Sequence, residues 1–240
     1  TFHAPNNNGS FLQAYALQKY ITTHFDNVEN EIIDFQPESQ QQQYAIFRKI
    51  HSKKDILRNL ISSWHYKALS KRFLAFSEMR EKYLKMTKRC TTTEEAIKIA
   101  GNYDLVIAGS DQIWNTTARD FSEAFFLPGI SKKSTYAVSC GSHLNEVNCD
   151  RICSAMETFE NVSVREIDTR EFLEKHTKRR IETVLDPTFL LTKEDYSGLY
   201  DKERILKEKY IFLYTINYDE DALKQTVRVA ERLGGLKNME

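Results

Sequence analysis

The sequence lacks an excess of charge of either sign. Its 240 residues include 34 Lys and Arg and 34 Asp and Glu, so the formal net charge at pH 7 is zero. Nucleic-acid-binding domains usually carry a basic excess, so we expect no nucleic-acid partner. The sequence also lacks an apolar run long enough to cross a bilayer and a recognisable secretion signal. These two absences predict a cytoplasmic protein.

Cysteine is scarce as well, with only four residues, Cys90, Cys140, Cys149 and Cys153. A cytosolic chain keeps its thiols reduced, so we expect no disulfides. Cys149 and Cys153 share one helical face, and Cys140 lies close to His143 in the sequence, so one interpretation is a zinc site. The interpretation that we favour is that the thiols are buried as small hydrophobic groups, with no metal bound.

Short apolar runs alternate with amphipathic stretches along the chain. Nearly continuous apolar runs are typical of strands covered on both faces, so the alternation predicts an α/β fold with a Rossmann-like parallel sheet and flanking helices. The Gln-rich stretch Gln40–Gln43 is expected to be a loop. The predicted strands are 31–35, 105–108, 134–139, 162–164, 183–185 and 210–216, and the predicted helices are 10–24, 55–64, 69–85, 93–100, 146–159, 166–176 and 219–233.

The two ends suggest a piece of a longer protein. The chain begins with Thr1 instead of Met, and only one strand and one helix follow residue 209 before it stops. A single strand and helix cannot cover a sheet, so we expect an incomplete second domain.

The segment 46–89 is strongly basic, with thirteen Lys and Arg against three acidic residues. Leu57, Leu60, Ile61 and Trp64 recur at helical spacing. The favoured interpretation is a pair of packed helices with a solvated basic face. The alternative is a surface for anionic glycans or lipid headgroups, which would place the protein at the membrane periphery.

A turn-forming cluster, 6–10, leads directly into the first predicted helix. Ligands of open α/β sheets bind at the carboxyl ends of the strands, and helix N-termini favour phosphate or carboxylate. Asn7 and Gly9 are therefore candidate binding residues, since glycine lets a ligand approach the backbone closely. The alternative is simple capping of the helix by Asn8 or Ser10.

Polar residues also follow the strand 105–108. Gly109 comes directly after it, then Ser110, Asp111 and Gln112, and Ile113-Trp114 follow. Polar groups held by large buried neighbours suit a pre-organised site. We therefore consider Asp111 a candidate catalytic residue and Ser110 and Gln112 candidate binding residues, with a capping role for Asp111 as the alternative.

Two further strand ends carry charged residues. Arg165 follows 162–164, and its planar fork of donors suits a carboxylate or a phosphate, although a salt bridge with Glu166 or Asp168 would explain it equally well. Asp186 precedes Pro187 and is more easily explained as a structural group than as a catalyst.

Taken in order, these blocks resemble the polysaccharide pyruvyl transferase family. The resemblance rests on Asn7-x-Gly9 with 12–17, on 109–115 (GSDQIWN), on Tyr136-Ala137-x-Ser139, on 163–166 and on 185–188. The block 109–115 is the most specific. Asn8 stands where the family usually has an aromatic residue, and Cys140 stands where Phe is common; neither change removes a chemically competent group.

The resemblance implies a two-domain architecture like that of the GT-B glycosyltransferases. Residues 1–206 would form the N-terminal Rossmann-like domain, with 46–89 as a basic helical insert, and 207–240 would begin the C-terminal domain. The family's donor-binding His and Arg residues belong largely to that second half. We therefore expect the 240-residue chain to be inactive by itself.

The resemblance also implies the reaction. A bacterial enzyme of this kind transfers a pyruvyl group from phosphoenolpyruvate to a sugar of a cell-surface polysaccharide and forms a ketal, without a further cofactor. Asp111 would orient or deprotonate the acceptor, which could be lipid-linked, and Arg165 would bind the donor. The alternatives are a GT-B-type glycosyltransferase that uses a nucleotide-sugar and a non-catalytic glycan-binding domain.

Overall fold

The computed structural model describes residues 1–141, 144–200, 209–215, 218–234 and 237–239. The chain divides into two compact units, Thr1–Thr192 and Lys193–Glu240. The domain boundary expected between 206 and 207 lies outside the described residues. No helix within the described part of the chain is both long enough and apolar enough to cross a membrane.

Helices were predicted well in the first unit, where each expected helix is present. The capping box of α5 shows why: Thr92 and Glu95 each bond the backbone of the other, which fixes the start of the helix. The loop expected at Gln40–Gln43 is wrong, because these residues lie in a helix, as the good helix propensity of Gln allows. The helices are α1 (Asn8–His24), α2 (Glu38–Tyr44), α3 (Lys53–Trp64), α4 (Tyr66–Tyr83), α5 (Thr93–Ala100), α6 (Glu146–Met156) and α7 (Ile167–Leu173), with two 3₁₀ helices, η1 (Glu123–Phe126) and η3 (Pro187–Leu190).

Four short strands carry the parallel pairing of this unit: β1 (Val106–Ala108), β2 (Lys133–Thr135), β3 (Ser163–Val164) and β4 (Glu182–Thr183). β1 pairs with β2 and β3 pairs with β4, all in parallel. Isolated parallel bridges from Ser134 to Asn161 and from Val138 to Val164 join the two pairs. The strands therefore follow one another in the order β1-β2-β3-β4, and the predicted α/β class with parallel strands is confirmed.

The strands are shorter than predicted because side chains replace part of the backbone pairing. Between β2 and β3, the Thr135 hydroxyl donates to the Ser163 carbonyl at 2.8 Å and accepts from the Ser163 N–H at 2.6 Å. Ala137 then adopts a positive φ of 52°, which interrupts the extended backbone. The predicted strand 31–35 forms only two isolated bridges, from Ile32 to Met86 and from Phe35 to Cys90.

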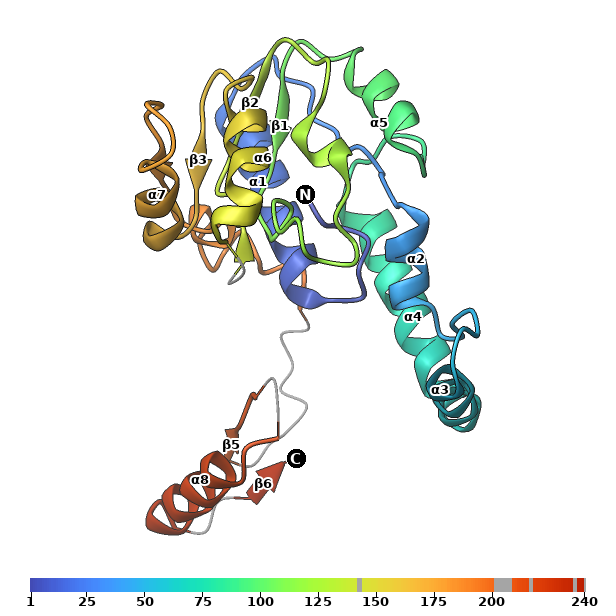
Figure 1. Cartoon of the computed structure of the whole chain (residues 1–240). Helices are drawn as coiled ribbons and strands as arrows, with labels where there is room; N and C mark the ends of the chain where they lie inside the picture. The colour runs from blue at the N-terminus through green and yellow to red at the C-terminus, as the bar shows by residue number, and fades with distance from the viewer. Residues whose placement is uncertain (142–143, 201–208, 216–217, 235–236, 240) are drawn as a thin grey trace. The chain divides into compact units, whose positions relative to one another are not determined.

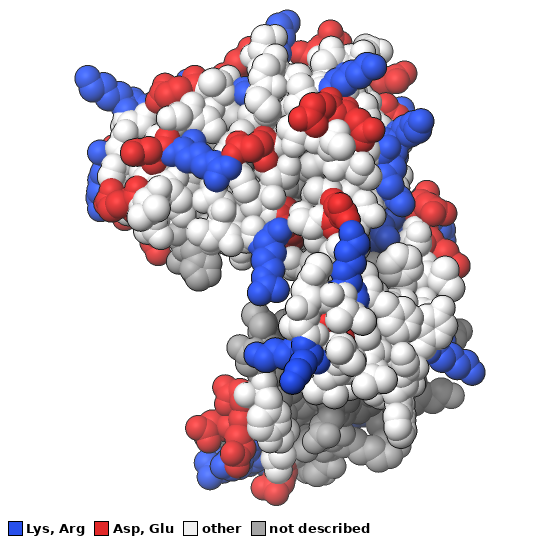
Figure 2. All heavy atoms as spheres, turned by 45° about the vertical axis from the view of Figure 1, so that its right-hand side comes forward, with Lys and Arg blue, Asp and Glu red and all other residues white. Residues whose placement is uncertain are grey.

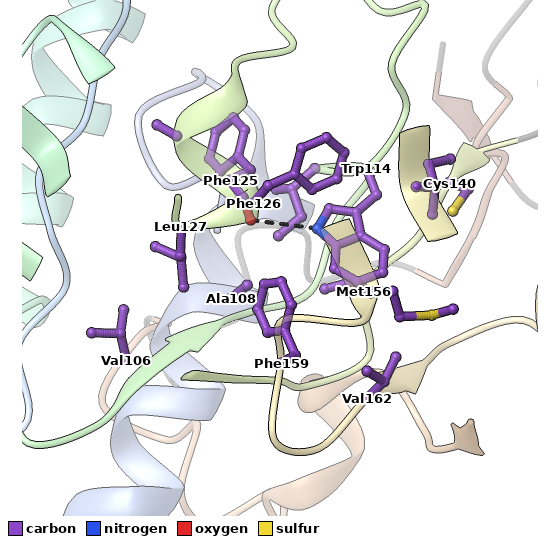
Figure 3. Close-up of a cluster of buried hydrophobic side chains, with 14 of the residues drawn as sticks. Val106, Ala108, Trp114, Phe125, Phe126, Leu127, Cys140, Met156, Phe159 and Val162 are labelled. Atoms are coloured by element: carbon purple, nitrogen blue, oxygen red, sulfur yellow. Dashed lines mark hydrogen bonds between the residues drawn. The ribbon is translucent and has the colours of Figure 1, made fainter. Parts of the chain in front are cut away.

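The hydrophobic core lies between β1, β3, α6 and the loop that contains η1, and Trp114 is at its centre (Figure 3). The Trp114 ring is fully buried and packs edge-on against Phe126 and Phe159. Its indole N–H donates to the Phe125 carbonyl at 3.4 Å. The loop after β1 is thus anchored in the core three residues beyond Asp111.

The faces of the strands are covered by different helices. α6 buries Cys149, Ile152 and Met156 in the core cluster around Trp114. α1 buries Phe11, Ala14 and Ala16, none of which belongs to that cluster, and it packs on η3. In Figure 1, α6 is drawn in front of the strands and α1 behind them.

The basic segment forms a helical hairpin of α3 and α4, which are separated by His65 alone (Figure 1). The expected pair of contacting helices is present, but the apolar stripe of α3 is not packed inside it. Leu57, Leu60, Ile61 and Trp64 are between 54% and 87% exposed. The hairpin projects from the body of its unit, so the apolar stripe does not reach the hydrophobic core of that unit.

The second unit contains β5 (Tyr210–Phe212), α8 (Glu220–Arg232) and β6 (Lys237–Met239). β5 and β6 pair in parallel, so these elements form a βαβ unit. The predicted strand 210–216 is confirmed over its first three residues, and residue 216 lies outside the described part. The sequence did not predict β6, because Lys237 and Asn238 do not form an apolar run.

Candidate functional site

The polar residues that were predicted at strand ends do lie along one edge of the parallel strands. Asp111 follows β1, Arg165 follows β3 and Asp186 follows β4. Parallel bridges from Asp111 to Val138 and from Val138 to Val164 keep these strand ends side by side. This is the edge where open α/β sheets bind ligands.

The N-terminus of α1 meets this edge. Asn7 caps the helix, with its Oδ1 accepting from the N–H groups of Gly9 at 2.7 Å and Ser10 at 3.4 Å. The alternative of capping by Asn8 or Ser10 is therefore wrong in detail, because Asn8 is the first helical residue and Ser10 bonds elsewhere. Asn7 also lines a pocket that is described below.

Asp111 is held at both carboxylate oxygens. Its Oδ2 accepts from the Ser10 hydroxyl at 2.7 Å and its Oδ1 accepts from the Gln112 N–H at 2.8 Å. The residue has φ of 78°, an unusual backbone conformation for a residue with a side chain. Such conformations persist where the surroundings impose them, and they cluster at functional sites.

Gln112 is placed by its neighbours in the same motif. Its Oε1 accepts from the Asn115 Nδ2 at 3.2 Å. Gly141 passes directly beneath this pair: a Cβ there would lie 2.8 Å from both side-chain atoms, and its φ is 65°. Glycine has no Cβ and readily adopts a positive φ, so the backbone can run this close to the motif.

A pocket of about 370 Å³ opens beside these residues. Three of the predicted site residues, Asn7, Asp111 and Gln112, line it. It also holds polar groups that the sequence did not single out as site residues: Ser10, Gln43, Tyr44, Arg119 and Asp120.

Asp120 and Tyr44 are the titratable groups whose pKa values the pocket alters. Burial raises the pKa of the Asp120 carboxyl, and the charge of Asp111 raises it further. Burial also raises the pKa of Tyr44, with Asp120 and Asp111 adding to the effect. Asp120 lies in an irregular loop, and Tyr44 ends the helix whose residues Gln40–Gln43 were predicted as a loop, so no periodic pattern marked either residue.

Ser110 and Gly9 contribute differently from what the sequence suggested. Ser110 is fully buried, and its carbonyl accepts from the Thr1 hydroxyl at 3.0 Å. Gly9 is exposed, with its N–H bonded to Asn7. Neither residue is among those lining the pocket.

Arg165 also stands outside the pocket lining, and it is already paired. Its Nε donates to Glu166 at 2.9 Å and its Nη1 donates to Asp186 at 3.1 Å. Burial acts to lower the pKa of the Arg165 guanidinium, but the two carboxylates outweigh it and the pKa is raised. The salt bridge with Glu166 that was weighed as an alternative is therefore present.

Asp186 has the structural role expected of it. Its Oδ1 accepts from the N–H and from the hydroxyl of Thr188, and Asp186 thereby caps the N-terminus of η3. Its Oδ2 accepts from Gln13 on α1 as well as from Arg165. The residue therefore ties α1, the end of β3 and η3 together.

The cysteines are free thiols, and Cys90, Cys140 and Cys149 are buried, as predicted. Cys149 and Cys153 approach to 3.6 Å between their sulfur atoms. Over the described residues, no group of three or more His, Cys, Asp or Glu side chains is arranged to hold a metal ion. His143, considered with Cys140 as a zinc ligand, lies outside those residues.

Of three comparisons with known proteins, one gave a match, and it agrees with the motif blocks. Searches of curated proteins and of solved structures gave no match. The sequence model described as polysaccharide pyruvyl transferase matches residues 7–238, which include the pocket motifs and both units. The chain therefore belongs to the polysaccharide pyruvyl transferase family, whose members are transferases.

Proposed function

We propose that this protein transfers a pyruvyl group from phosphoenolpyruvate to a sugar of a cell-surface polysaccharide and forms a pyruvate ketal. The observation that carries the proposal is the pocket that Asp111, hydrogen-bonded to Ser10, lines together with Asn7, Gln112, Arg119 and Asp120. It combines hydrogen-bonding groups for sugar hydroxyls with carboxyl groups for proton transfer.

Asp111 is our candidate for binding and activating the acceptor. Two sugar hydroxyl oxygens must attack C2 of the enol, and each loses its proton. A carboxylate oxygen within hydrogen-bond reach can accept such a proton. The Ser10 hydroxyl and the Gln112 N–H orient the Asp111 carboxylate, and no Lys or Arg side chain within the described residues forms an ion pair with it.

Asp120 is our candidate for the proton donor. In the balanced reaction C3 of the enol gains a proton and becomes a methyl group, C2 forms bonds to two sugar oxygens, and the bond from C2 to the phosphate oxygen breaks. A carboxyl whose pKa is raised by burial can hold a proton closer to neutral pH. Of the two protons removed from the sugar hydroxyls, one leaves with the phosphate and the other replaces the proton that Asp120 gave to C3.

The donor carries a carboxylate and a phosphate, so cationic groups must face it. Arg165 remains a candidate, but it would have to exchange Glu166 or Asp186 for the donor. Arg119 lines the pocket and makes no hydrogen bond or ion pair within the described residues, so it can meet an anion without such an exchange. Ser110 and Gly9 would contribute to substrate binding indirectly, by fixing the backbone of the loops that carry Asp111 and Asn7.

A GT-B-like architecture remains part of the proposal. The βαβ unit of β5, α8 and β6 supports it, because a second Rossmann-like domain would be built from such units. The donor-binding His and Arg residues of the family would then lie in that second domain. A cytoplasmic protein acting on a lipid-linked acceptor is consistent with this scheme.

The full-length protein should be incubated with phosphoenolpyruvate and a β-galactoside, and the formation of the ketal should be followed by mass spectrometry. Asp111→Asn keeps the shape of the side chain but removes its basicity, so we expect turnover to fall at least ~100-fold, as for loss of a general base. Circular dichroism should show an unchanged fold. Turnover like that of the unsubstituted protein would contradict the assignment of Asp111.

Ligand-dependent melting separates the alternatives. Phosphoenolpyruvate at about 100 times its dissociation constant should stabilise the protein by ~2.7 kcal/mol. Stabilisation by UDP-sugars instead would indicate a nucleotide-sugar glycosyltransferase. Stabilisation by the glycan alone, with no turnover, would indicate a glycan-binding domain.

A further inference from the structure

The α3–α4 hairpin turns its apolar residues outward. Leu57, Leu60, Ile61 and Trp64 form one stripe along α3 and are 60%, 64%, 54% and 87% exposed. Ser62 is the only buried residue of α3. An amphipathic helix of a globular domain normally turns such a stripe toward the core, so another surface should cover this one.

The apolar stripe reaches a groove of about 460 Å³ between the two helices. Leu57 and Ile61 of α3 line it together with Leu69 of α4, and Lys54 and Arg58 lie at its border. Tyr66 and Leu74 of α4 are more than half exposed.

The charge around the stripe has one sign. Residues 46–74 contain eight Lys and Arg and one acidic residue, Asp55, so their net charge is 8 − 1 = +7. Asp55 is engaged at the start of α3, where its Oδ2 accepts from the Ser52 hydroxyl at 2.8 Å. Figure 2 brings this side of the molecule forward and shows Lys and Arg around an uncharged surface.

The lysines of the hairpin are available to a partner. Lys53, Lys54, Lys67 and Lys71 are exposed and form no ion pair within the part of the chain that the structure describes. The rest of the chain must carry the balancing negative charge, since the whole has 34 residues of each sign. The partner of this surface should therefore be anionic and able to accept Leu, Ile and Trp.

We propose that the α3–α4 hairpin docks on the surface of an anionic phospholipid bilayer. Leu57, Leu60 and Ile61 would enter the boundary between headgroups and acyl chains, and Trp64 would lie at the interface. The lysines would contact headgroup phosphates. A short helix with a basic polar face and an apolar Trp and Leu face is typical of binding in the plane of a membrane.

Other occupants fit less well. Nucleic acid would use the lysines but leaves Leu57, Leu60 and Ile61 without a role. A two-fold contact with a second copy would place a charge of +7 against an equal charge. The proposal goes beyond the transferase reaction, and its test needs no turnover.

The two tryptophans make the test direct. The chain has two Trp residues, of which Trp64 is 87% exposed and Trp114 is 0% exposed. The fluorescence of the folded chain should be measured with vesicles of phosphatidylcholine alone and with vesicles containing phosphatidylglycerol. We expect a blue shift from Trp64, and co-sedimentation, only with phosphatidylglycerol, and we expect salt to weaken both.

Matched variants identify the surface. Leu57→Ser, Leu60→Ser and Ile61→Ser together should abolish sedimentation, while serine at the exposed Val147, Leu185 and Phe189 should leave it unchanged. Lys53→Glu with Lys54→Glu should lower the partition coefficient at least about tenfold, because two positive charges at the surface are reversed, and Lys175→Glu with Lys178→Glu should not. Circular dichroism checks that each variant is folded.

Several results would overturn the proposal. Equal binding to neutral vesicles would show unspecific hydrophobic adsorption. No binding to either vesicle, or binding that survives the three serine substitutions in folded protein, would exclude the hairpin as a lipid surface. A change from dimer to monomer on these substitutions, without lipid binding, would assign the surface to a second copy.

Discussion

The hydroxyl of Ser10 donates to the carboxylate of Asp111 at 2.7 Å, across 101 positions of sequence. This bond joins the first turn of α1 to the loop after β1. Both residues line the pocket, so the orientation of the proposed base depends on a residue of another element.

Removing this hydroxyl should affect turnover more than folding. In Ser10→Ala, Asp111 loses its only partner at Oδ2 among the described contacts, and we expect turnover to fall about tenfold or more, with a loss of ~1 kcal/mol in the free energy of unfolding. Ser10→Thr keeps the hydroxyl and should restore most of the turnover. Equal losses of turnover in both variants would show that bulk at this position matters and the hydrogen bond does not.

Asp120 should show opposite effects on stability and turnover. Because its folded-state pKa is raised, the folded state is penalised when the carboxylate ionises as pH rises. Asp120→Asn removes the ionisation, so the free energy of unfolding at pH 7 should rise while turnover falls. Thermal melting and ketal formation measure the two effects. A variant that is less stable and fully active would contradict the proposed role.

Gly141 should tolerate no side chain. In Gly141→Ala, the new Cβ would meet Gln112 and Asn115 at 2.8 Å with φ at 65°. We expect a loss of about 2 kcal/mol or more in the free energy of unfolding. Gly129 is the matched control: its φ is 76° but nothing lies within 4 Å, so Gly129→Ala should cost only the backbone strain, about 1 kcal/mol. Equal losses in urea melts would show that the contact at Gly141 is unimportant.

Asp34 should contribute to acid stability. Burial acts to raise its pKa, but hydrogen bonds from His3 at 2.8 Å and Gln36 at 2.6 Å outweigh it and lower the pKa to about 2. Because the folded-state pKa lies below the unfolded value of 3.8, the ionised Asp34 stabilises the fold above pH 3.8. This stabilisation is lost as the pH falls toward 2. The shift corresponds to about 2 kcal/mol.

The measurement is the free energy of unfolding between pH 6 and pH 2, taken from urea melts. Asp34→Asn should be destabilised at pH 6 and should lose less stability than the unsubstituted protein on acidification. Asp150→Asn, at an exposed position, should behave like the unsubstituted protein. Parallel pH curves for all three proteins would contradict the contribution assigned to Asp34.

Thiol reactivity should follow burial. Burial raises the pKa of Cys90 to about 11 and of Cys149 to about 12, and it raises the pKa of Cys140 as well. Cys153 is the one cysteine that is partly exposed. At pH 8 iodoacetamide should label Cys153 slowly and the others hardly at all, because the thiolate is the reactive form. Mass spectrometry of native and denatured samples checks this, and fast labelling of native Cys140 would contradict it.

Helices and the parallel α/β class could be predicted because they depend on local patterns. The capping box of Thr92 and Glu95 and the apolar run of β1 are visible in the sequence. Strand length was overestimated because Thr135 and Ser163 replace ladder bonds with side-chain bonds, which no periodicity shows. The exposed stripe of α3 was misjudged because a helical period gives the apolar face and not what covers it.

The positions of the pocket residues could be predicted where they depend on strand ends and not where they depend on loops. Asp111 and Gln112 follow an apolar strand, so their edge of the sheet could be inferred. Asp120 and Arg119 reach the same pocket through an irregular loop, whose path is set by tertiary contacts. The pairing of Arg165 with Asp186 joins residues 21 positions apart, and the sequence offered Glu166 and Asp168 as equally plausible partners.

The burial of Trp114 affects how this protein unfolds and loses activity on heating. The indole fills the centre of the core and leads, within three residues, to the strained backbone of Asp111. The loop that carries Asp111 is held by this buried ring, so it has little freedom to unfold before the core does. Heat inactivation and global unfolding should therefore share one midpoint, in contrast to enzymes whose active-site loops loosen first.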